Sequence, residues 1–561
     1  MPNTSIKLDD KFNIKKSNVL LNGTQGLVRL MLGQKQRDEK QGLNTAGFVT
    51  GYRGSPLGAV DFQMRRASKE LLASKIKFKE ALNEDLATTA LWGAQQAELR
   101  GEGLYDGVFG LWYGKGPGVD RSGDAMRHAN MAGSSVHGGV LMAMGDDHSG
   151  ESSTVLHQSD LAMIDAGMPI LSPAGVQEIL DYGYYGFALS RYSGLWVGLK
   201  TMKDTIEVTS VVDGDPFRME FKKPKKITGA DNLNIRLVDT PADQEKRLLN
   251  DKKNAAEDFA RVNRIDKIVL PKRDAKIGLV AAGKNWLDLI HALSLLGIDE
   301  REAAALGITS YKIVQTWPID RKSLHEWADQ LDLIIVIEEK RKIVEAQIKD
   351  ALFSIGSKTR VYGGHKNDEK LFLDHGVLDP FDLASTLGQI FKEEGCSNKT
   401  LELSLKKITE VQSVDNAPDL AERLPYFCAG CPHNSSTIVP EGSRAYAGIG
   451  CHYMAQWMDR ETLGFTHMGG EGANWIGESL FSKRQHVFQN IGDGTYNHSG
   501  IQAIRAAVAA NTDITYKILF NDAVAMTGGQ GNDGQLSAMR IVNELLAIGI
   551  ENTVLVYDDK E

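Results

Sequence analysis

Two short segments near the end of the chain carry residues that could hold a diphosphate and a divalent cation. The first, Gly492-Asp493-Gly494, follows an apolar run typical of a strand and precedes a helical pattern. A helix that begins there offers the positive end of its dipole to a phosphate, and the glycines permit a sharp turn. Asn521 ends the next predicted strand, and its amide oxygen is a hard ligand suited to Mg²⁺. An ordinary strand-to-helix turn is the alternative for the glycine segment.

Three of the four cysteines form a second candidate site. Cys428 and Cys431 are separated by two residues, and Cys451 follows the second of them by twenty positions. A C-x-x-C turn places two thiolates toward one metal ion or one iron-sulfur cluster. Structural zinc is the main alternative, because three histidines could supply the fourth ligand: His433, His452 and His467. Buried free thiols are the third interpretation, and Cys396 lies outside the spacing.

The N-terminal part carries polar loops after apolar strands, at what we expect to be the ligand-binding edge of a parallel sheet. Arg53 and Ser55 lie in the loop GYRGSPLG, and a second loop, GDDHSGE, spans 145–151. The carboxylates of that second loop could be catalytic, could hold the loop, or could bind a neighbouring subunit. Glu84 begins a helical pattern, where the simplest interpretation is that it complements the helix dipole.

Composition limits the class of protein. The net charge of −9, with 24% charged and 42% hydrophobic residues, is ordinary for a soluble globular chain and argues against a nucleic-acid surface. Four cysteines in 561 residues are too few for a disulfide framework. The sequence shows neither a signal-peptide pattern nor a run of eighteen apolar residues, so we expect a cytoplasmic protein without a membrane segment.

The order of elements predicts an α/β protein with several parallel-sheet units. Alternating strand and helix patterns, with glycine turns between them, fill three stretches of the chain. We expect α/β domains at 1–220, 276–395 and 421–561, joined by a polar connection at 221–275, whose charge we expect to be solvated, and a linker at 396–420. Gly283 and Lys284 could hold an anion in the middle domain, although a short turn needs glycine for its geometry alone. We expect that domain to serve docking or dimerisation.

Four segments together resemble the thiamine-diphosphate-dependent 2-oxoacid:ferredoxin oxidoreductases, and among these the long fused indolepyruvate form. They are CAGCPHNSS, AGIGCHYMAQWM, MGGEGANWIG and NIGDGTYNHSG. The resemblance covers nearly the whole chain. It implies a pyrimidine-binding domain first, a transketolase C-terminal-like domain in the middle and a diphosphate-binding domain last, with the active site between the first and last, commonly across a homodimer interface.

The resemblance also implies roles for individual residues. Glu84 matches the glutamate that hydrogen-bonds the aminopyrimidine ring and promotes ylid formation. Ser55 matches a substrate-loop hydroxyl that binds the oxoacid carboxylate, with Arg53 as its partner. Three groups of residues match cofactor positions: Asp493, Asn521 and the carbonyl of Ala523 as Mg²⁺ ligands; Gly492, Gly494, Gly470 and Glu471 beside thiamine diphosphate; and Cys428, Cys431 and Cys451 as ligands of a 4Fe-4S cluster.

The implied activity is oxidative decarboxylation of an aryl pyruvate to an acyl-CoA, with coenzyme A as acyl acceptor and ferredoxin as electron acceptor. Alternatives are another 2-oxoacid as substrate, a non-oxidative thiamine diphosphate decarboxylase, or a zinc-stabilised docking subunit without catalytic activity. Two features depart from the family pattern. No cysteine follows Gln530, where related enzymes carry the fourth cluster ligand, and the sequence ends directly after a predicted strand. We therefore expect it to be the N-terminal half of a longer protein.

Overall fold

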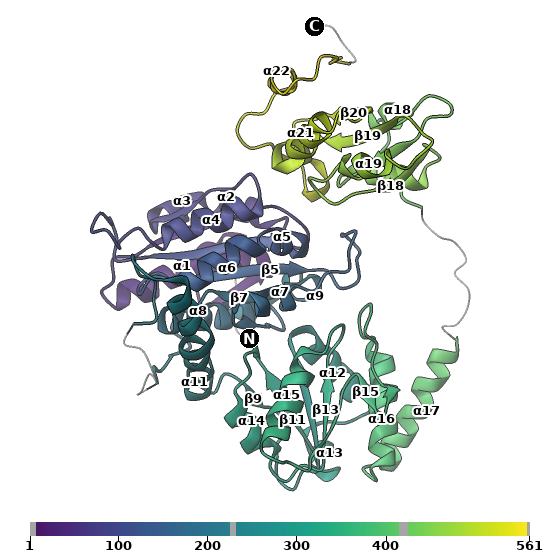
Figure 1. Cartoon of the computed structure of the whole chain (residues 1–561). Helices are drawn as coiled ribbons and strands as arrows, with labels where there is room; N and C mark the ends of the chain where they lie inside the picture. Colours follow the sequence, from purple (N-terminus) through teal and green to yellow (C-terminus); the bar gives the residue numbers. More distant parts are fainter. Residues whose placement is uncertain (1–6, 225–231, 415–423, 558–561) are drawn as a thin grey trace. The chain divides into compact units, whose positions relative to one another are not determined.

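The structure is a computed structural model that describes residues 7–224, 232–414 and 424–557. The chain folds as two compact units, Met1–Ala417 and Pro418–Glu561 (Figure 1). The first unit contains two α/β lobes, which we call the first lobe (7–263) and the second lobe (267–414). The second unit contains a four-stranded sheet and a two-stranded sheet formed by β21 (Ala523–Val524) and β22 (Gln530–Gly531).

A mainly parallel sheet forms the first lobe, with strand order β12-β6-β7-β5-β4-β2-β3. In chain order its strands are β2 (Ala46–Gly51), β3 (Ile76–Phe78), β4 (Val108–Lys115), β5 (Val140–Asp146), β6 (Ile170–Leu171), β7 (Val197–Met202) and β12 (Gln315–Trp317). Successive residues of a strand face opposite sides of the sheet. Leu111 thus packs in the core with helices α1 (Gly23–Lys40) and α8 (Val176–Ser193), whereas Trp112 packs with α4 (Glu84–Ala94) and α6 (Gly123–Ala132).

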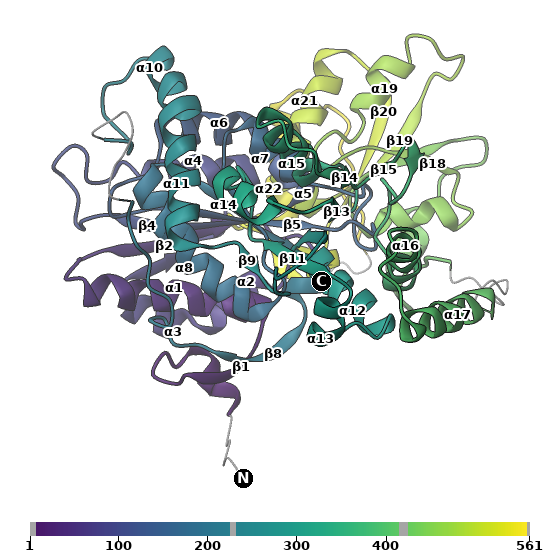
Figure 2. The same ribbon diagram turned by 90° about the horizontal axis from the view of Figure 1, so that it is seen from below.

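The polar segment 241–263 at the end of the first lobe packs against the helices of that lobe. Helix α10 (Pro241–Lys246), a π-helical turn (Arg247–Lys252) and α11 (Lys253–Asn263) follow one another as one rod (Figure 2). Phe259 of α11 stacks on Tyr192 of α8 with 5.2 Å between ring centroids. Arg247 and Lys252 are buried, so the expectation that this segment presents its charges to solvent is wrong for these two residues.

The second lobe has a five-stranded sheet in the order β14-β13-β10-β11-β9. Its parallel strands are β10 (Ile277–Ala282), β11 (Ile308–Ile313), β13 (Leu333–Ile337) and β14 (Arg360–Tyr362), and β9 (Lys267–Ile268) is antiparallel. Helices α12 (Gly283–Leu295) and α16 (Pro380–Glu393) cover one face, and α14 (Arg321–Ala328) and α15 (Ile343–Ser354) cover the other. The chain of this lobe also supplies β12, which pairs antiparallel with β6 and so ties the two lobes together.

The second unit has a parallel four-stranded sheet in the order β18-β17-β19-β20. Its strands are β17 (Ala445–Ala447), β18 (Thr462–Phe465), β19 (Val487–Gly492) and β20 (Ile514–Leu519). The main helices are α19 (Ala473–Glu478), α21 (Ile501–Ala509) and α22 (Ala538–Ala547). Because β19 and β20 run parallel in register, with Gly492 opposite Leu519, the loops after both strands emerge at one edge.

The fold class expected from the sequence, α/β with several parallel-sheet units, is confirmed by these three sheets. Among the described residues, no helix is both long and apolar enough to cross a membrane.

Candidate functional site

Asp493 lies at the carboxyl edge of β19, directly after Gly492, and its side chain is almost fully buried at 2% exposure. Its Oδ1 accepts a hydrogen bond from the backbone N–H of Gly494 at 2.9 Å. Its Oδ2 accepts from the backbone N–H of Asn521 at 3.1 Å and from Nδ2 of Asn532 at 2.9 Å. Burial raises the pKa of this carboxyl above its ordinary value, despite these three hydrogen bonds.

The structure brings Asn521 to Asp493, since the loop after β20 turns back over the end of β19. The side-chain oxygen of Asn521 accepts from the N–H of Ala523 at 3.0 Å, and Asp522 between them has φ of 54°, in the left-handed region. Gly492 does not use the conformational freedom that a sharp turn was predicted to need. Gly492 has φ of −77°, so no special conformation requires a glycine there. A Cβ at Gly492 would meet nothing closer than 3.9 Å, which leaves open space beside Asp493.

Glu471 lies in the loop between β18 and α19 and is completely buried. Its carboxylate accepts hydrogen bonds from the N–H of Gly469 at 2.7 Å and of Ile449 at 3.3 Å. Burial raises its pKa to about 7. A Cβ at Gly470 would lie 2.4 Å from the ring of His467. These contacts show that Glu471 ties two loops of the second unit together, and its predicted position beside a cofactor stays a prediction.

The three cysteines of the candidate metal site lie near one another in the second unit. The N–H of Cys431 donates to the carbonyl of Cys428 at 3.0 Å. Burial raises the pKa of the Cys451 thiol, and the neighbouring thiolates of Cys431 and Cys428 raise it further. His452 is buried with a pKa lowered to about 3, because burial disfavours its charged form. Within the described ranges, however, no three His, Cys, Asp or Glu side chains are arranged to hold a metal ion.

Glu84 is placed at the first turn of α4 in the first lobe. Asn83 caps this helix by accepting from the N–H of Leu86 at 3.1 Å. Glu84 is only 5% exposed, and a Cβ at Gly118 would lie 2.5 Å from its carboxylate oxygen. The interaction with a helix dipole is also stronger at partly buried positions, so the burial of Glu84 against Gly118 agrees with both the dipole interpretation and the predicted cofactor role.

Ser55 and Arg53 follow β2, but they point to different neighbours. The hydroxyl of Ser55 accepts a hydrogen bond from Ser152 Oγ at 3.0 Å. The buried guanidinium of Arg53 faces Asp61, with 3.4 Å between Nε and Oδ2. Tyr113 donates to the other oxygen of Asp61 at 2.5 Å, and burial raises the pKa of Asp61 to about 6. The substrate role of Arg53 stays a prediction, and the structure gives its guanidinium a structural task in the core.

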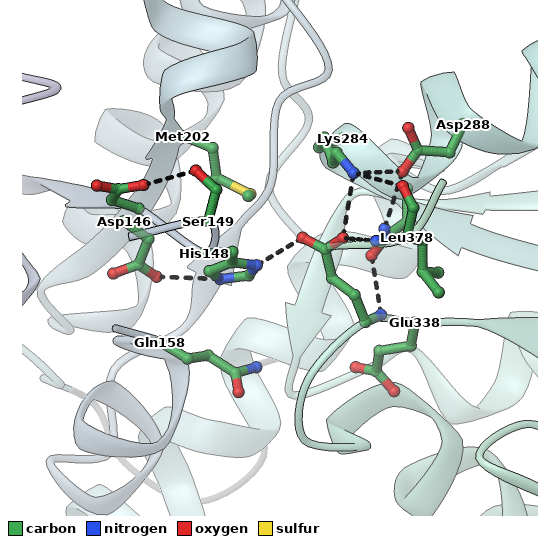
Figure 3. Close-up of polar contacts among 12 residues, drawn as sticks. Asp146, His148, Ser149, Gln158, Met202, Lys284, Asp288, Glu338 and Leu378 are labelled. Carbon is green, nitrogen blue, oxygen red and sulfur yellow. Dashed lines mark hydrogen bonds and ion pairs between the residues drawn. The ribbon is translucent and has the colours of Figure 1, made fainter. Parts of the chain in front are cut away.

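A buried network of charges joins the two lobes of the first unit (Figure 3). Glu339, after β13, accepts from His148 Nδ1 at 2.5 Å, from Lys284 Nζ at 3.2 Å and from the N–H of Leu378 at 3.0 Å. Burial acts to raise the pKa of Glu339, but its bond to His148 and the charges of His148 and Lys284 hold that pKa well below the ordinary value. His148 Nε2 in turn lies 3.9 Å from Asp146 of the first lobe.

Three residues of the network, His148, Lys284 and Glu339, also line a cavity of about 40 Å³. Lys284 forms an ion pair with Asp288 at 3.0 Å besides the one with Glu339, so its charge is already balanced and the anion role considered for it is disfavoured.

Hydrogen bonds with Asp120 and Asp146 raise the pKa of His157 to about 9, against the opposite effect of burial. Sequence reasoning considered the 145–151 loop but could not find Glu339, because nothing in the pattern shows that the carboxyl edges of two sheets meet.

Two domain families match the chain. An indolepyruvate oxidoreductase domain matches residues 267–415, which is the second lobe. A thiamine pyrophosphate enzyme, C-terminal TPP binding domain matches residues 448–544 and so includes both Asp493 and Asn521.

Curated relatives extend the similarity along nearly the whole chain. The chain is 25% identical over 555 residues to indolepyruvate oxidoreductase subunit IorA of Pyrococcus abyssi, covering 95% of this chain and 78% of the relative. It is 24% identical over 528 residues to the same subunit of Methanothermobacter marburgensis, covering 90% and 77%. A solved 2-oxoglutarate:ferredoxin oxidoreductase from Magnetococcus marinus aligns with a TM-score of 0.48 and 14% identity, covering 67% of this chain and 66% of that one. The resemblance inferred from sequence motifs is confirmed by the two domain matches and the curated relatives.

Proposed function

We propose, from its similarity to indolepyruvate oxidoreductases and thiamine pyrophosphate enzymes, that this protein oxidatively decarboxylates an aryl pyruvate such as indolepyruvate. The acyl group passes to coenzyme A and the electrons pass to ferredoxin. The choice of an aryl side chain is supported by the indolepyruvate oxidoreductase domain and by the names of the curated relatives. Coenzyme A, ferredoxin and a homodimeric assembly rest on the sequence resemblance.

The observation that carries this proposal is the group of oxygen ligands around Asp493. Its carboxylate is buried, and no ion pair with Lys, Arg or His balances it in the described part of the chain. A buried carboxylate without a counterion is costly, and a divalent cation would supply the missing charge. Asn521 is already hydrogen-bonded to it, and Gly492 leaves open space beside it. These residues fit Mg²⁺ bound with a diphosphate, with the carbonyl of Ala523 as a further ligand.

The remaining roles belong to side chains of the first lobe. Bound thiamine diphosphate supplies the carbanion chemistry of decarboxylation. Glu84 would hydrogen-bond the aminopyrimidine ring nitrogen of bound thiamine diphosphate, a role that needs a dry environment and so agrees with its burial. Ser55 donates its hydroxyl to the carboxylate of the oxoacid. Each of these roles is a proposal that rests on the match to the family motif and on the placement of the side chain.

The three cysteines support an iron-sulfur cluster less strongly than the residues around Asp493 support Mg²⁺. Cys428, Cys431 and Cys451 lie close enough to influence one another electrostatically, which supports three thiolate ligands. The described residues nevertheless hold no ready metal group, and a fourth ligand is not identified among them. We therefore propose these three cysteines as ligands of a 4Fe-4S cluster and derive no electron-transfer step from them.

An anaerobic analysis of the purified full chain tests the proposal. The measurements are Mg²⁺-dependent binding of thiamine diphosphate, the iron, sulfide and zinc content, and reduction of ferredoxin by indolepyruvate with coenzyme A. Bound thiamine diphosphate with about four iron and four sulfide per chain, and substrate-dependent reduction, is the expected result. Thiamine diphosphate without iron, and carbon dioxide released without ferredoxin reduction, would instead indicate a non-oxidative decarboxylase. Zinc without thiamine diphosphate would indicate a docking subunit and overturn the proposal.

A further inference from the structure

A lysine absent from the predicted site lies at the carboxyl edge of the first-lobe sheet. Lys115 is the last residue of β4, next to the edge where Ser55 follows β2 and Ser152 follows β5. Its Nζ donates to the carbonyl oxygen of Ser152 at 3.2 Å. The hydroxyl of the same Ser152 donates to Ser55 Oγ at 3.0 Å. Lys115 and Ser55 thus share one neighbour.

The stem of Lys115 also lies against the backbone that carries Ser55. A Cβ at Gly54 would stand 2.7 Å from Cδ of Lys115, so glycine at this position leaves the room that the lysine occupies. Asp147 keeps the facing loop closed, because its carboxylate accepts from the N–H of Ser152 at 2.8 Å. Contacts within the first lobe therefore hold the ammonium of Lys115, the hydroxyl of Ser55 and the loop that carries Ser152 close together.

The charge of Lys115 has no close partner. Burial lowers the pKa of its ammonium, while the more distant charges of Asp147 and Glu84 act in the opposite direction. In the part of the chain that the structure describes, the ammonium of Lys115 donates one hydrogen bond, to the carbonyl of Ser152, and forms no ion pair. Two of its three N–H donors are left for a ligand, and a desolvated cation of this kind gains most from an anionic acceptor.

We infer that Lys115 and Ser55 together form the subsite for the carboxylate of the 2-oxoacid substrate. This inference rests on the proposed function and replaces Arg53 by Lys115 as the cation of the substrate loop. Arg53 is less suited to this task because its guanidinium is directed to Asp61 in the core. The subsite recognises the carboxylate shared by all 2-oxoacids, and it leaves the choice of side chain to other residues.

The test compares binding of phenylpyruvate and of its uncharged methyl ester to the full chain, by calorimetry in the presence of Mg²⁺ and thiamine diphosphate. The variants are Lys115→Met, which removes the charge, and Lys115→Arg, which keeps it. Lys69→Met removes an exposed lysine of the same lobe and serves as the matched control. We expect wild type and Lys69→Met to prefer the acid over the ester. Lys115→Met should bind the acid about ten- to a hundredfold more weakly and lose this preference, because a hydrogen bond between charged groups is lost. Lys115→Arg should keep most of the preference for the acid over the ester.

The outcomes separate this inference from the proposed function. An unchanged preference in Lys115→Met overturns the subsite, and so does an equal loss of acid and ester binding, which would indicate a structural role for the lysine. Wild-type protein that binds thiamine diphosphate but prefers the ester, or binds neither compound, overturns the subsite and leaves the cofactor site standing. Failure of the wild type to bind thiamine diphosphate overturns the proposed function itself.

Discussion

Replacing Glu339 by glutamine should strongly weaken the connection between the two lobes of the first unit. The carboxylate is 3% exposed and accepts from His148, Lys284 and the N–H of Leu378. Glutamine keeps one acceptor, so we count the loss of two charge-assisted hydrogen bonds at about 1.5 kcal/mol each. The sum of about 3 kcal/mol agrees with the ~3–5 kcal/mol typical of breaking a buried ion pair by removing one partner.

The assay is equilibrium unfolding in urea at pH 7, followed by tryptophan fluorescence, for wild type, Glu339→Gln and Glu410→Gln. Glu410 is the matched control, because its carboxylate pairs with Lys406 at the surface, 4.0 Å away. Exposed pairs contribute little to stability, so the control should unfold like wild type. A Glu339→Gln protein as stable as the control would refute the view that this network holds the lobes together.

The pH dependence gives a second check on the same residue. The pKa of Glu339 is lowered in the folded protein, so its stabilising contribution is fully present above the ordinary glutamate pKa of about 4.3 and is lost as the pH falls below it. The difference in unfolding free energy between wild type and Glu339→Gln should therefore be larger at pH 5 than at pH 3. A difference that grows on acidification would contradict the assignment.

Three further predictions concern the proposed cofactor sites. Asp493→Ala should weaken Mg²⁺-dependent thiamine diphosphate binding at least about tenfold, as measured by calorimetry, whereas the exposed Asp513→Ala should not. Glu84→Gln should lower turnover of an aryl pyruvate by about 10²–10⁴ and leave thiamine diphosphate affinity within a few-fold, so retained turnover would remove Glu84 from its role. Cys451→Ser should lower the iron content of anaerobically purified protein while Cys396→Ser does not, and equal iron in both would exclude Cys451 as a ligand.

The parts of the fold set by local patterns could be predicted from the sequence. The parallel pairing of β19 with β20 follows from two apolar runs separated by a helix, and it brings Asp493 and Asn521 together as expected. The backbone conformation of the turn after β19 could not be predicted from such a pattern. The glycines are predicted to permit a sharp turn, yet the φ of Gly492 is ordinary, whereas Asp522 in the loop after β20 is left-handed. Glycine is compatible with many conformations, so its presence does not identify the one adopted.

Contacts between residues far apart along the chain could not be predicted from the sequence. The segment with Arg247 and Lys252 is polar in sequence, yet both side chains are buried. Lys252 Nζ donates to the carbonyls of Met131 at 3.3 Å and Gly194 at 3.4 Å. These acceptors lie 121 and 58 residues away along the chain. Composition predicts whether a segment is polar on average, but it does not show which carbonyl groups at helix ends need a donor.

Lys115 and Lys284 show how the same local pattern acquires different chemistry from its surroundings. Each follows a glycine where a parallel strand meets the next helix, although the anion role considered from the sequence concerns Lys284 alone. In the fold, Lys284 meets two carboxylates within 3.2 Å, and an anion at this position would have to displace charges that are already paired. Among the described residues, the ammonium of Lys115 donates to the carbonyl of Ser152 and forms no ion pair. Because an ammonium group removed from water is stabilised by whichever anion reaches it, an anionic substrate gains more at Lys115 than at Lys284.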